Sequence, residues 1–498
     1  MIQNVEVSEL FGVENYAEQI PLQEPVRLLI DEAESLVRSL RGRRVWMVNS
    51  TSQGGGVAEM MPKLISLLRE LGVDAHWLVM SPSRPEFFAL TKRLHNLIHG
   101  EGDPQLGPDD RALYDAESRE NAELLKGRLS PDDLLVIHDP QPLGMGAILK
   151  QSLGLPAIFR CHIGLDEERP QTRAAWGFLQ PYAEPFDHAV FSAREYIPGF
   201  LAGRSSVICP AIDPLSYKNR DLSPQKLMGV LCNARLAREE HPVVPEPFES
   251  CAKRLDSEGH FVPADRDGGI GLLYRPIVTQ ISRWDRLKGW KPLLDAFVEM
   301  KQRLVCGKSP FPERHRRRME IVRLVLAGPD PAAIADDPEG REVLDELIES
   351  YKALPSRLQS DIAVVSLPMD SRHQNELMVN ALQRCSGIVV QNSLREGFGL
   401  TVTEAMWKRA TVLGSATCGI RQQLRDGVDG RLIDDPTDSS AIAELLDRTL
   451  EDLPGRDRLG RNAQRRVHSE FLVLTQVRRW LEVLSGCAEA IEKSEYQD

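Results

Sequence analysis

The sequence predicts an α/β chain made of two doubly wound, Rossmann-like domains. Short β-branched runs alternate with helical patterns from residue 43 onward, which is typical of parallel strands joined by crossover helices. The chain has 498 residues, and single hydrophobic cores stop growing at about 250 to 300 residues. Its hydrophobic content of 42% and charged content of 27% are ordinary for globular proteins, which excludes a mainly disordered or fibrous chain.

The candidate strands fall into two groups, one in each half of the chain. Those of the first half cover residues 43–49, 75–80, 133–138, 156–161, 188–192 and 206–210. Those of the second half cover residues 277–282, 321–327, 362–367, 387–392, 411–414 and 431–433. Each group is sufficient for one parallel sheet covered on both faces. The apolar spacing of residues 470–493 predicts a long terminal helix.

Domain boundaries follow from the segment between the two groups. Residues 221–275 carry Pro, Gly and mixed charge with weak periodicity, so we interpret them as an interdomain connection enlarged by an insertion. The first domain then covers residues 1–220 and the second residues 276–469. A further polar stretch, residues 306–320, is interpreted as a solvated loop, with nucleic-acid contact as the alternative.

Charge and cysteine usage exclude several classes of protein. A formal net charge of −12 leaves no broad basic field for nucleic acid or an anionic membrane. The chain contains no long apolar run and its N-terminal stretch is acidic, so we expect a cytoplasmic protein without a transmembrane helix or signal peptide. The eight cysteines form no C-x-x-C pair, which argues against a disulfide framework and a zinc site.

A glycine run stands between the first candidate strand and a helical pattern. Gly54, Gly55 and Gly56 would let backbone N–H groups approach a phosphate or a sugar at a helix N-terminus. The spacing is not G-x-G-x-x-G, and glycine runs also serve plain tight turns, so both readings stay open.

Two cations follow the strand at 277–282. Arg283 and Lys288 stand five residues apart across a turn at the carboxyl end of this strand, where doubly wound sheets bind their ligands. Arginine offers a bidentate fork and lysine a point charge, so the pair is suited to a diphosphate. The alternative is an exposed turn with incidental charge.

The densest signal lies in residues 391–410. Glu396 stands in a glycine-bearing turn, and a helix is expected to begin near Leu400 with Glu404 about one turn inside it. The backbone amides of Phe398, Gly399 and Leu400 would then form an anion site at the helix N-terminus. The alternative is a turn residue and a carboxylate that merely suits the helix dipole.

Polar residues also end two successive strands of the first half. His138, with Asp139 directly after it, ends one strand, and His162 follows the next. A lone histidine at a strand end is more often structural than catalytic, but two such clusters at one sheet leave both readings open. No carboxylate pair with metal-ligand spacing follows an expected strand, and no H-E-x-x-H motif occurs, so we predict no dedicated metal site.

At these residues the sequence resembles the retaining GT-B glycosyltransferases. The match consists of two carboxylates with seven residues between them, the two cations, one histidine and the glycine loop: Glu396, Glu404, Arg283, Lys288, His162, Gly55 and Gly56. Within that class, seven stretches are similar to the trehalose glycosyltransferring synthases: residues 49–60, 136–143, 160–166, 210–219, 279–290, 326–330 and 395–408.

The resemblance implies a GT-B fold, in which two Rossmann-like domains face a cleft. The N-terminal domain would hold the acceptor and the C-terminal domain the nucleotide sugar, with residues 470–498 crossing back to the first domain. Arg283 and Lys288 would hold the donor diphosphate, and Glu404 the ribose hydroxyls. Glu396 would bind hydroxyls of the donor sugar, and His162 would lie beside that sugar.

Further contacts are assigned by the same resemblance. Gly55 and Gly56 would approach the phosphate and glucosyl groups. The amides at 398–400 would bind the donor as well, and Asp139 and Glu59 are expected to contact the acceptor. The insertion near 235–275 and the basic stretch at 306–320 lengthen this chain relative to the shorter synthases, and either can reshape the acceptor cleft or an interface.

The activity implied is transfer of glucose from a nucleotide diphosphoglucose, such as UDP-glucose or ADP-glucose, to glucose, with retention, forming trehalose. No cofactor is then required, and Mg²⁺ would at most stimulate. The alternatives are a retaining trehalose phosphorylase, a different sugar acceptor, and a non-catalytic protein that keeps the GT-B shape. The expected partners are the nucleotide sugar and a small sugar acceptor, without nucleic acid or membrane; homodimer formation stays open.

Overall fold

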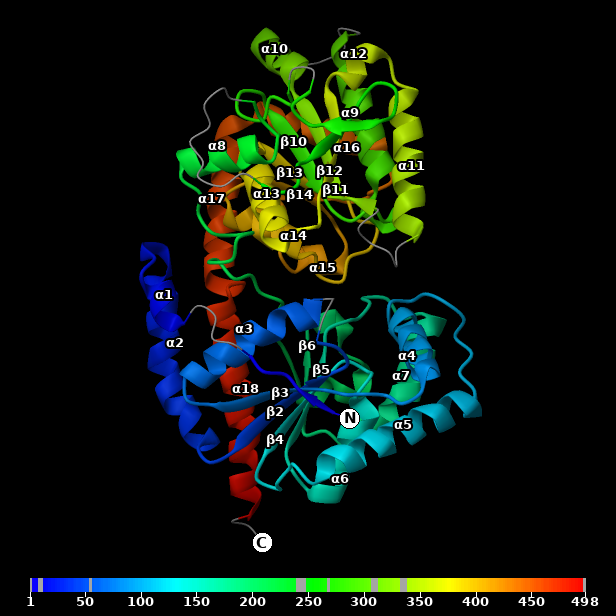
Figure 1. The fold of residues 1–498 in the computed structure, drawn as a ribbon, viewed down its shortest axis with the longest axis vertical. Coiled ribbons are helices and arrows are strands. Elements are labelled where there is room, and N and C mark those ends of the chain that lie inside the picture. The colour runs from blue at the N-terminus through cyan, green and yellow to red at the C-terminus, as the bar shows by residue number, and fades with distance from the viewer. Residues whose placement is uncertain are drawn as a thin grey trace. The chain divides into compact units, whose positions relative to one another are not determined.

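The protein consists of two compact units. The computed structural model describes residues 2–7, 12–52, 56–238, 248–266, 269–305, 312–331 and 338–495. The first unit comprises Met1–Ala211 with Glu470–Asp498, and the second comprises Ile212–Ser469 (Figure 1). The C-terminal segment is therefore part of the first unit, although the whole second unit lies between it and the rest of that unit in the sequence.

The first unit is built on a seven-stranded sheet in the order β1-β3-β2-β4-β5-β6-β7. Its strands are β1 Gln3–Asn4, β2 Arg44–Asn49, β3 Asp74–Val79, β4 Leu134–His138, β5 Ala157–Cys161, β6 His188–Phe191 and β7 Ser205–Val207. All neighbouring strands are parallel except β1 and β3. Strands β2 to β7 correspond to the six strands predicted for the first half, whereas the two-residue edge strand β1 was too short to predict.

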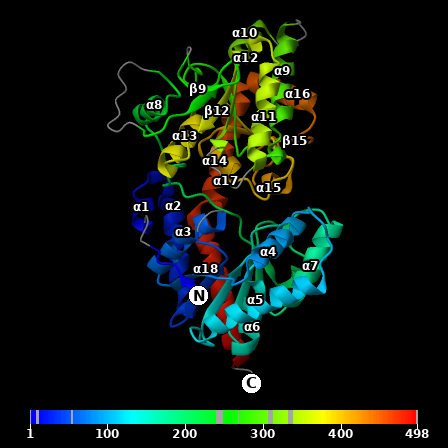
Figure 2. The same ribbon diagram turned by 45° about the vertical axis from the view of Figure 1, so that its right-hand side comes forward.

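Helices of the first unit form two groups (Figure 2). The α-helices are α1 Val13–Ala17, α2 Gln23–Leu36, α3 Gly56–Glu70, α4 Pro85–Ile98, α5 Pro108–Lys126, α6 Leu143–Leu153, α7 Pro170–Ala183 and α18 Val473–Glu495, and the 3₁₀ helices are η1 Ile20–Leu22, η2 Val37–Leu40, η3 Arg194–Tyr196 and η4 Gly199–Arg204. Helices α4 to α7 pack against one another, and α18 packs against α2, η2 and α3. Strands β4 and β5 are buried at every position, as parallel strands covered on both faces should be.

The second unit is built on an eight-stranded sheet in the order β15-β14-β13-β10-β11-β12-β8-β9. Its strands are β8 Lys253–Leu255, β9 Phe261–Pro263, β10 Ile277–Ile281, β11 Arg323–Pro329, β12 Ile362–Leu367, β13 Ile388–Gln391, β14 Thr411–Ser415 and β15 Arg431–Ile433. The six strands from β10 to β15 are parallel and match those predicted for the second half. The hairpin β8–β9 adds an antiparallel edge next to β12.

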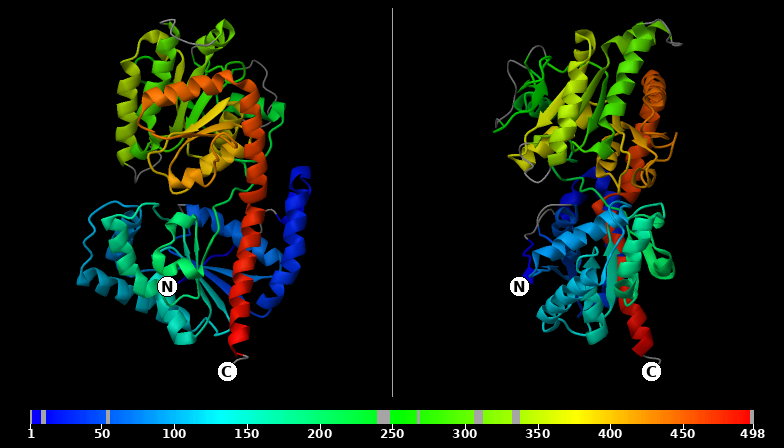
Figure 3. Two further views of the ribbon diagram at one scale, coloured as in Figure 1. Left: turned by 180° about the vertical axis from the view of Figure 1, so that it is seen from behind. Right: turned by 90° about the vertical axis from the view of Figure 1, so that its right-hand side faces the viewer.

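Two apolar cores cover the two faces of this sheet, and Figure 3 shows the helices that lie on them. The helices are α8 Pro224–Asn233, α9 Trp290–Val305, α10 Glu313–Ile321, α11 Pro338–Lys352, α12 Ser356–Gln359, α13 Arg372–Cys385, α14 Leu400–Trp407, α15 Cys418–Arg421, α16 Ser439–Glu451, α17 Leu453–Glu470 and the 3₁₀ helix η5 Arg286–Lys288. One core is formed with α9, α11 and α16, and the other with α8 and α13. The unit is therefore doubly wound, as the sequence predicts.

The structure corrects two expectations about connecting segments. Residues 221–275 are not a separate connection, because their described part belongs to the second unit, where Leu231, Ala252 and Ile270 are fully buried in its core. The stretch at 306–320 is not a solvated loop in its described part, because residues from Glu313 onward form α10. His315 of α10 is buried and contacts Asp447 at 2.8 Å, a contact that the run of arginines obscured in the sequence.

Within the described ranges of the chain, every helix is too short or too polar to cross a membrane.

Candidate functional site

The strand order of the second unit marks one place where a ligand would bind. β10 lies between β11 and β13, so the chain leaves β10 toward one side of the sheet and later returns to the other. Ligands of doubly wound folds bind outside the carboxyl ends of the strands at such a switch point. The loops that follow β10 and β13 carry Arg283, Lys288 and Glu396.

A hydrogen-bond network joins these two loops. The backbone N–H of Leu394 donates to the carbonyl of Leu287 at 2.7 Å. The Gln280 side-chain amide donates to the carbonyl of Lys288 at 2.7 Å and accepts from the backbone N–H of Asn392 at 3.0 Å. Because Gln280 and Asn392 are fully buried, this network fixes the backbone that carries Lys288.

Lys288 and Glu396 form a direct ion pair at this place. The Lys288 Nζ lies 2.6 Å from the Glu396 Oε2, and both side chains are only 14% exposed. The same carboxylate oxygen accepts from the hydroxyl of Ser393 at 3.0 Å and from the amide of Gln391 at 3.4 Å. The sequence predicts that both residues bind the nucleotide-sugar donor, and the structure brings their side chains into contact.

Glycines allow the two loops to approach so closely. Gly289 has φ of +59°, and a Cβ at this position would lie 2.1 Å from the carbonyl oxygen of Asn392. Gly399, the N-cap of α14, has φ of +83°, and its Cβ would lie 2.8 Å from the Cγ of Glu396. Any other residue would be strained at both positions, so these glycines define the conformation of the site.

The helix start predicted near Leu400 is confirmed, since α14 begins at that residue. Phe398 is buried, Gly399 is partly buried and Leu400 is exposed. Glu404 lies inside the helix with 6% exposure, and its Oε1 is 3.5 Å from the Nζ of Lys218.

Lys408 lies one turn after Glu404. Its Nζ donates to the backbone carbonyl of Glu404 and to the side-chain oxygen of Asn219, both at 3.1 Å. Burial lowers the pKa of Lys408 to about 7, against the opposing influence of the Glu404 carboxylate.

Arg283 differs from Lys288 in its surroundings. Its guanidinium contacts the carboxylate of Asp285 at 3.7 Å, and its side chain is 66% exposed. The two predicted cations therefore differ: Lys288 is held by Glu396, whereas Arg283 is left mostly to solvent and can turn toward a ligand.

In the first unit the structure brings together three predicted polar residues. The Nδ1 of His138 lies 3.0 Å from the Nε2 of His162, and the two rings are stacked. The carboxylate of Asp139 accepts from the backbone N–H of His162 at 2.8 Å. Asp139 has φ of +65°, a left-handed conformation that asparagine and aspartate tolerate better than most residues.

Burial shifts the pKa values of this cluster. Burial lowers the pKa of His138 to about 3 and that of His162 well below its usual value, and the charge of Arg160 adds to both effects. Burial raises the pKa of Asp139 to about 6, against the hydrogen bond from His162. Both imidazoles are therefore neutral at physiological pH, and one nitrogen of each is an acceptor.

The other predicted residues of the first unit lie on or beside α3. Glu59 is exposed in the first turn of α3, which begins at Gly56. Gly55 lies outside the described residues, so its place in the predicted glycine loop is not part of the structure.

Several residues of these sites were missed in the sequence. Lys218 and Lys408 approach Glu404, Gln280 and Asn392 position the loops, and Arg160 lies fully buried next to the first-unit cluster. Lys218 and Lys408 do stand in stretches that resemble the trehalose synthases. The signal for Gln280 was an amide side chain in a strand of mostly β-branched residues.

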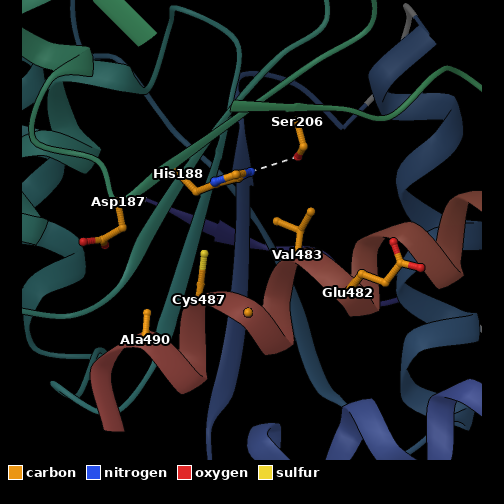
Figure 4. A pocket seen from close by; sticks show the side chains of 8 residues that line it. Asp187, His188, Ser206, Glu482, Val483, Cys487 and Ala490 are labelled. Carbon is orange, nitrogen blue, oxygen red and sulfur yellow. Dashed lines mark hydrogen bonds between the residues drawn. The ribbon is translucent and has the colours of Figure 1, made fainter. Parts of the chain in front are cut away.

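A pocket of the first unit lies away from its candidate residues. It has a volume of about 540 Å³ and lies between α18 and the amino-terminal side of β6 (Figure 4). His188, which donates to or accepts from Ser206 at 2.9 Å, faces Val483 and Cys487 of α18 across it. The candidate residues His138, Asp139 and His162 lie instead at the carboxyl ends of β4 and β5.

No group of three or more metal-ligating side chains occurs among the residues with described positions. One Asp-x-Asp pair, Asp265 and Asp267, does stand in the insertion, and Asp267 lies outside those residues.

Comparison with known proteins gives two consecutive family matches. The family described as "Trehalose synthase, N-terminal domain" matches residues 47–198, and "Glycosyl transferases group 1" matches residues 273–466. The trehalose synthase of Thermococcus litoralis is 33% identical over 477 residues, which cover 93% of this chain and 97% of that protein. The trehalose phosphorylase of Grifola frondosa is 27% identical over 462 residues, covering 88% of this chain and 56% of that protein.

Solved structures agree in fold. An α,α-trehalose-phosphate synthase (UDP-forming) from Burkholderia xenovorans, in complex with glucose-6-phosphate, is 15% identical with a TM-score of 0.59. The match covers 89% of this chain and 100% of that one. Together with the two doubly wound sheets, these findings define the chain as a glycosyltransferase of the GT-B fold. It belongs to the trehalose synthase family within the group 1 glycosyltransferases.

Proposed function

We propose that this protein is a retaining glucosyltransferase that transfers glucose from a nucleotide diphosphoglucose to free glucose and forms α,α-trehalose. The observation that carries the proposal is the Lys288–Glu396 pair, 2.6 Å apart at the switch point of the second unit. A nucleotide sugar carries a diphosphate next to a sugar. The pair offers a cation suited to the diphosphate beside a carboxylate suited to the sugar hydroxyls.

The charges of the second unit suit the leaving group. An ammonium group has three N–H donors, so the contact of Lys288 with Glu396 leaves donors for a diphosphate. Arg283 is exposed and can add a bidentate contact. Charge accumulates on the diphosphate as the glycosidic bond breaks, and fixed cations stabilise it most at that moment. Glu404, inside α14, is proposed to accept from the ribose hydroxyls.

The proposed reaction balances without a protein nucleophile. The acceptor hydroxyl oxygen forms a bond to the anomeric carbon on the face from which the diphosphate leaves. The bond between the anomeric carbon and the bridging phosphate oxygen breaks. The acceptor proton passes to the departing phosphate oxygen, and the nucleoside diphosphate is released. His162 and Asp139 of the first unit are proposed to contact the sugars through neutral imidazole and carboxylate acceptors, Glu59 to contact the acceptor, and Gly55 and Gly56 to approach the phosphate and glucosyl groups.

The direct test is a screen of donors and acceptors. We expect purified protein with UDP-, ADP- or GDP-glucose and free glucose to release the nucleoside diphosphate and a non-reducing disaccharide that trehalase cleaves. Released nucleotide and disaccharide are quantified by chromatography, with each donor alone as the hydrolysis control. Product only with an acceptor other than glucose would refute the trehalose assignment while leaving the glycosyltransferase intact.

A second candidate function is trehalose phosphorolysis, which the 27% identity with the Grifola frondosa phosphorylase favours. The two activities differ in their need for nucleotide. If trehalose and inorganic phosphate yield glucose 1-phosphate without nucleotide, the phosphorylase is the correct function and the nucleotide-dependent proposal is wrong.

We also propose that no bound metal ion is required, because no Asp-x-Asp pair follows any of the strands from β10 to β15. In EDTA at about 5 mM, on the order of a hundredfold excess over trace metal, we expect the enzyme to keep at least about half of its initial rate. The reason is that Mg²⁺ would act only on the free diphosphate. Complete loss in EDTA that Mg²⁺ or Mn²⁺ restores would contradict the proposal. Asp265→Asn serves as the variant that checks the Asp-x-Asp pair.

A further inference from the structure

The second unit contains another pocket, at the opposite end of the sheet from the proposed donor residues. It has a volume of about 310 Å³ and is lined by the first residues of β11 and β12 and by the β8–β9 hairpin. Arg283, Lys288 and Glu396 follow the carboxyl ends of parallel strands, whereas Arg323 and Ile362 open β11 and β12. A ligand in this pocket would therefore not overlap the proposed nucleotide-sugar site.

Two half-buried arginines converge in this pocket. Arg323 donates through one terminal nitrogen to the carbonyls of Gly269 at 2.9 Å and Ile270 at 2.6 Å. Arg254, on β8, donates to the same Gly269 carbonyl at 3.2 Å and to the Arg266 carbonyl at 3.0 Å. Two guanidinium groups that share one carbonyl oxygen lie close together, although like charges repel.

Neither arginine forms an ion pair with a carboxylate in the part of the chain that the structure describes, where Asp361 pairs instead with Arg275 and Lys301. The Nε of Arg323 is buried and makes no hydrogen bond there. Burial lowers the pKa of Arg323, and the charges of Arg275 and Arg254 lower it further, whereas Asp361 and Tyr274 act in the opposite direction. A half-buried guanidinium without a counter-charge is costly, which favours binding of an anion.

The two nearby carboxylates are committed to other groups. Asp361 lies 2.9 Å from the Nζ of Lys301 and 4.0 Å from Arg275. Asp256 accepts from the backbone N–H groups of Glu258 at 3.0 Å and His260 at 2.8 Å, which closes the hairpin turn. Among the described charged side chains that line the pocket, Arg254 and Arg323 stand against Asp256, which leaves a net positive charge there.

Hydroxyl groups complete the wall of the pocket. Ser257, Ser356 and Ser360 line it together with Tyr351. A volume of 310 Å³ is at the lower end of the range for small-molecule sites. The charge suits an oxyanion, guanidinium groups prefer phosphate or carboxylate, and the hydroxyls suit a small polar body.

We propose that this pocket, formed by Arg254 and Arg323 with the surrounding serines, binds a small phosphate ester of a polyol. The two guanidinium groups hold the phosphate, and the serine hydroxyls contact the polyol. The site is distinct from the donor site, so the ester and a nucleoside diphosphate bind at the same time.

Calorimetry of the full chain with glycerol 3-phosphate tests the proposal, in the presence of saturating UDP, which occupies the proposed donor site. We expect binding to persist under UDP and to weaken about 10- to 100-fold in Arg254→Gln, the scale of one charge-assisted contact. Arg254→Lys should retain part of the affinity. Lys253→Gln, which removes an exposed charge from the same strand, is the matched control and should bind as the unaltered protein does.

A second variant guards against a folding defect in the arginine variant. Ser257→Glu adds a negative charge at an exposed hairpin position and leaves every arginine hydrogen bond in place, so it should weaken the ester by a similar factor. Undiminished affinity in both Arg254→Gln and Ser257→Glu, or competition between UDP and glycerol 3-phosphate, would overturn the proposal. Binding of inorganic phosphate as tight as that of the ester would overturn the assignment of the polyol contacts.

Discussion

Replacing Arg283 by alanine is expected to lower kcat by a factor of about 10² to 10³, the scale of losing one donor to a developing anionic charge. The guanidinium is exposed and, among the described residues, pairs with Asp285 at 3.7 Å, a carboxylate that is itself partly exposed, so its removal leaves no fully buried charge unpaired. The fold should therefore stay intact while the departing diphosphate loses a cation.

The measurement is steady-state turnover with a nucleotide diphosphoglucose beside the thermal unfolding midpoint. Arg286→Ala is the matched control: it removes a guanidinium three residues away that pairs instead with Glu346 at 2.8 Å and Glu342 at 3.5 Å. The control should keep nearly full turnover. Full activity in Arg283→Ala would show that Arg283 is an exposed turn residue and no ligand.

Lys288→Ala should lower kcat to a similar extent, and it should also destabilise the protein. Glu396 is 14% exposed and would lose its 2.6 Å partner, which costs about 1 to 3 kcal/mol of unfolding free energy. A drop in unfolding midpoint in the Lys288 variant but not in the Arg283 variant distinguishes the buried pair from the exposed cation.

The strands and the family were predictable because their signals are local. Apolar runs such as 133–138 and 362–367 are buried at nearly every position in the structure, as parallel strands require. The hairpin β8–β9 was not predictable, since two three-residue strands are stabilised by pairing with β12 and not by their own sequence.

The candidate site was predictable in its residue types and not in its contacts. Lys288 and Glu396 stand 108 residues apart, and their pairing depends on the close approach of two loops at Gly289. The same limit applies to Lys218 beside Glu404, where the lysine belongs to a stretch that contains no strand. Pairings of this kind follow from the strand order, which local patterns leave open.

The second large effect separates the two carboxylates of the α14 region. Glu404→Gln is expected to weaken binding of free UDP or ADP by about 10- to 100-fold, because an amide accepts less strongly than a carboxylate and the ribose hydroxyls need an acceptor. Glu404 is 6% exposed, so the isosteric change keeps the packing of α14 while Lys218 loses its counter-charge.

Glu396→Gln should have the opposite profile. The free nucleotide has no sugar for this side chain to hold, so its affinity should change less than about threefold while turnover of the whole donor falls by about 10². The reason lies in the different surroundings of the two carboxylates. Glu396 pairs with Lys288 and accepts hydrogen bonds from Ser393 and Gln391 in the loop, whereas Glu404 lies inside the helix beside Lys218. The measurements are the affinity for free nucleotide, by calorimetry, and the turnover number, each for both variants. Equal loss of nucleotide affinity in both would mean that the two carboxylates do not divide the donor between ribose and glucose, and the assignment of both residues would be wrong.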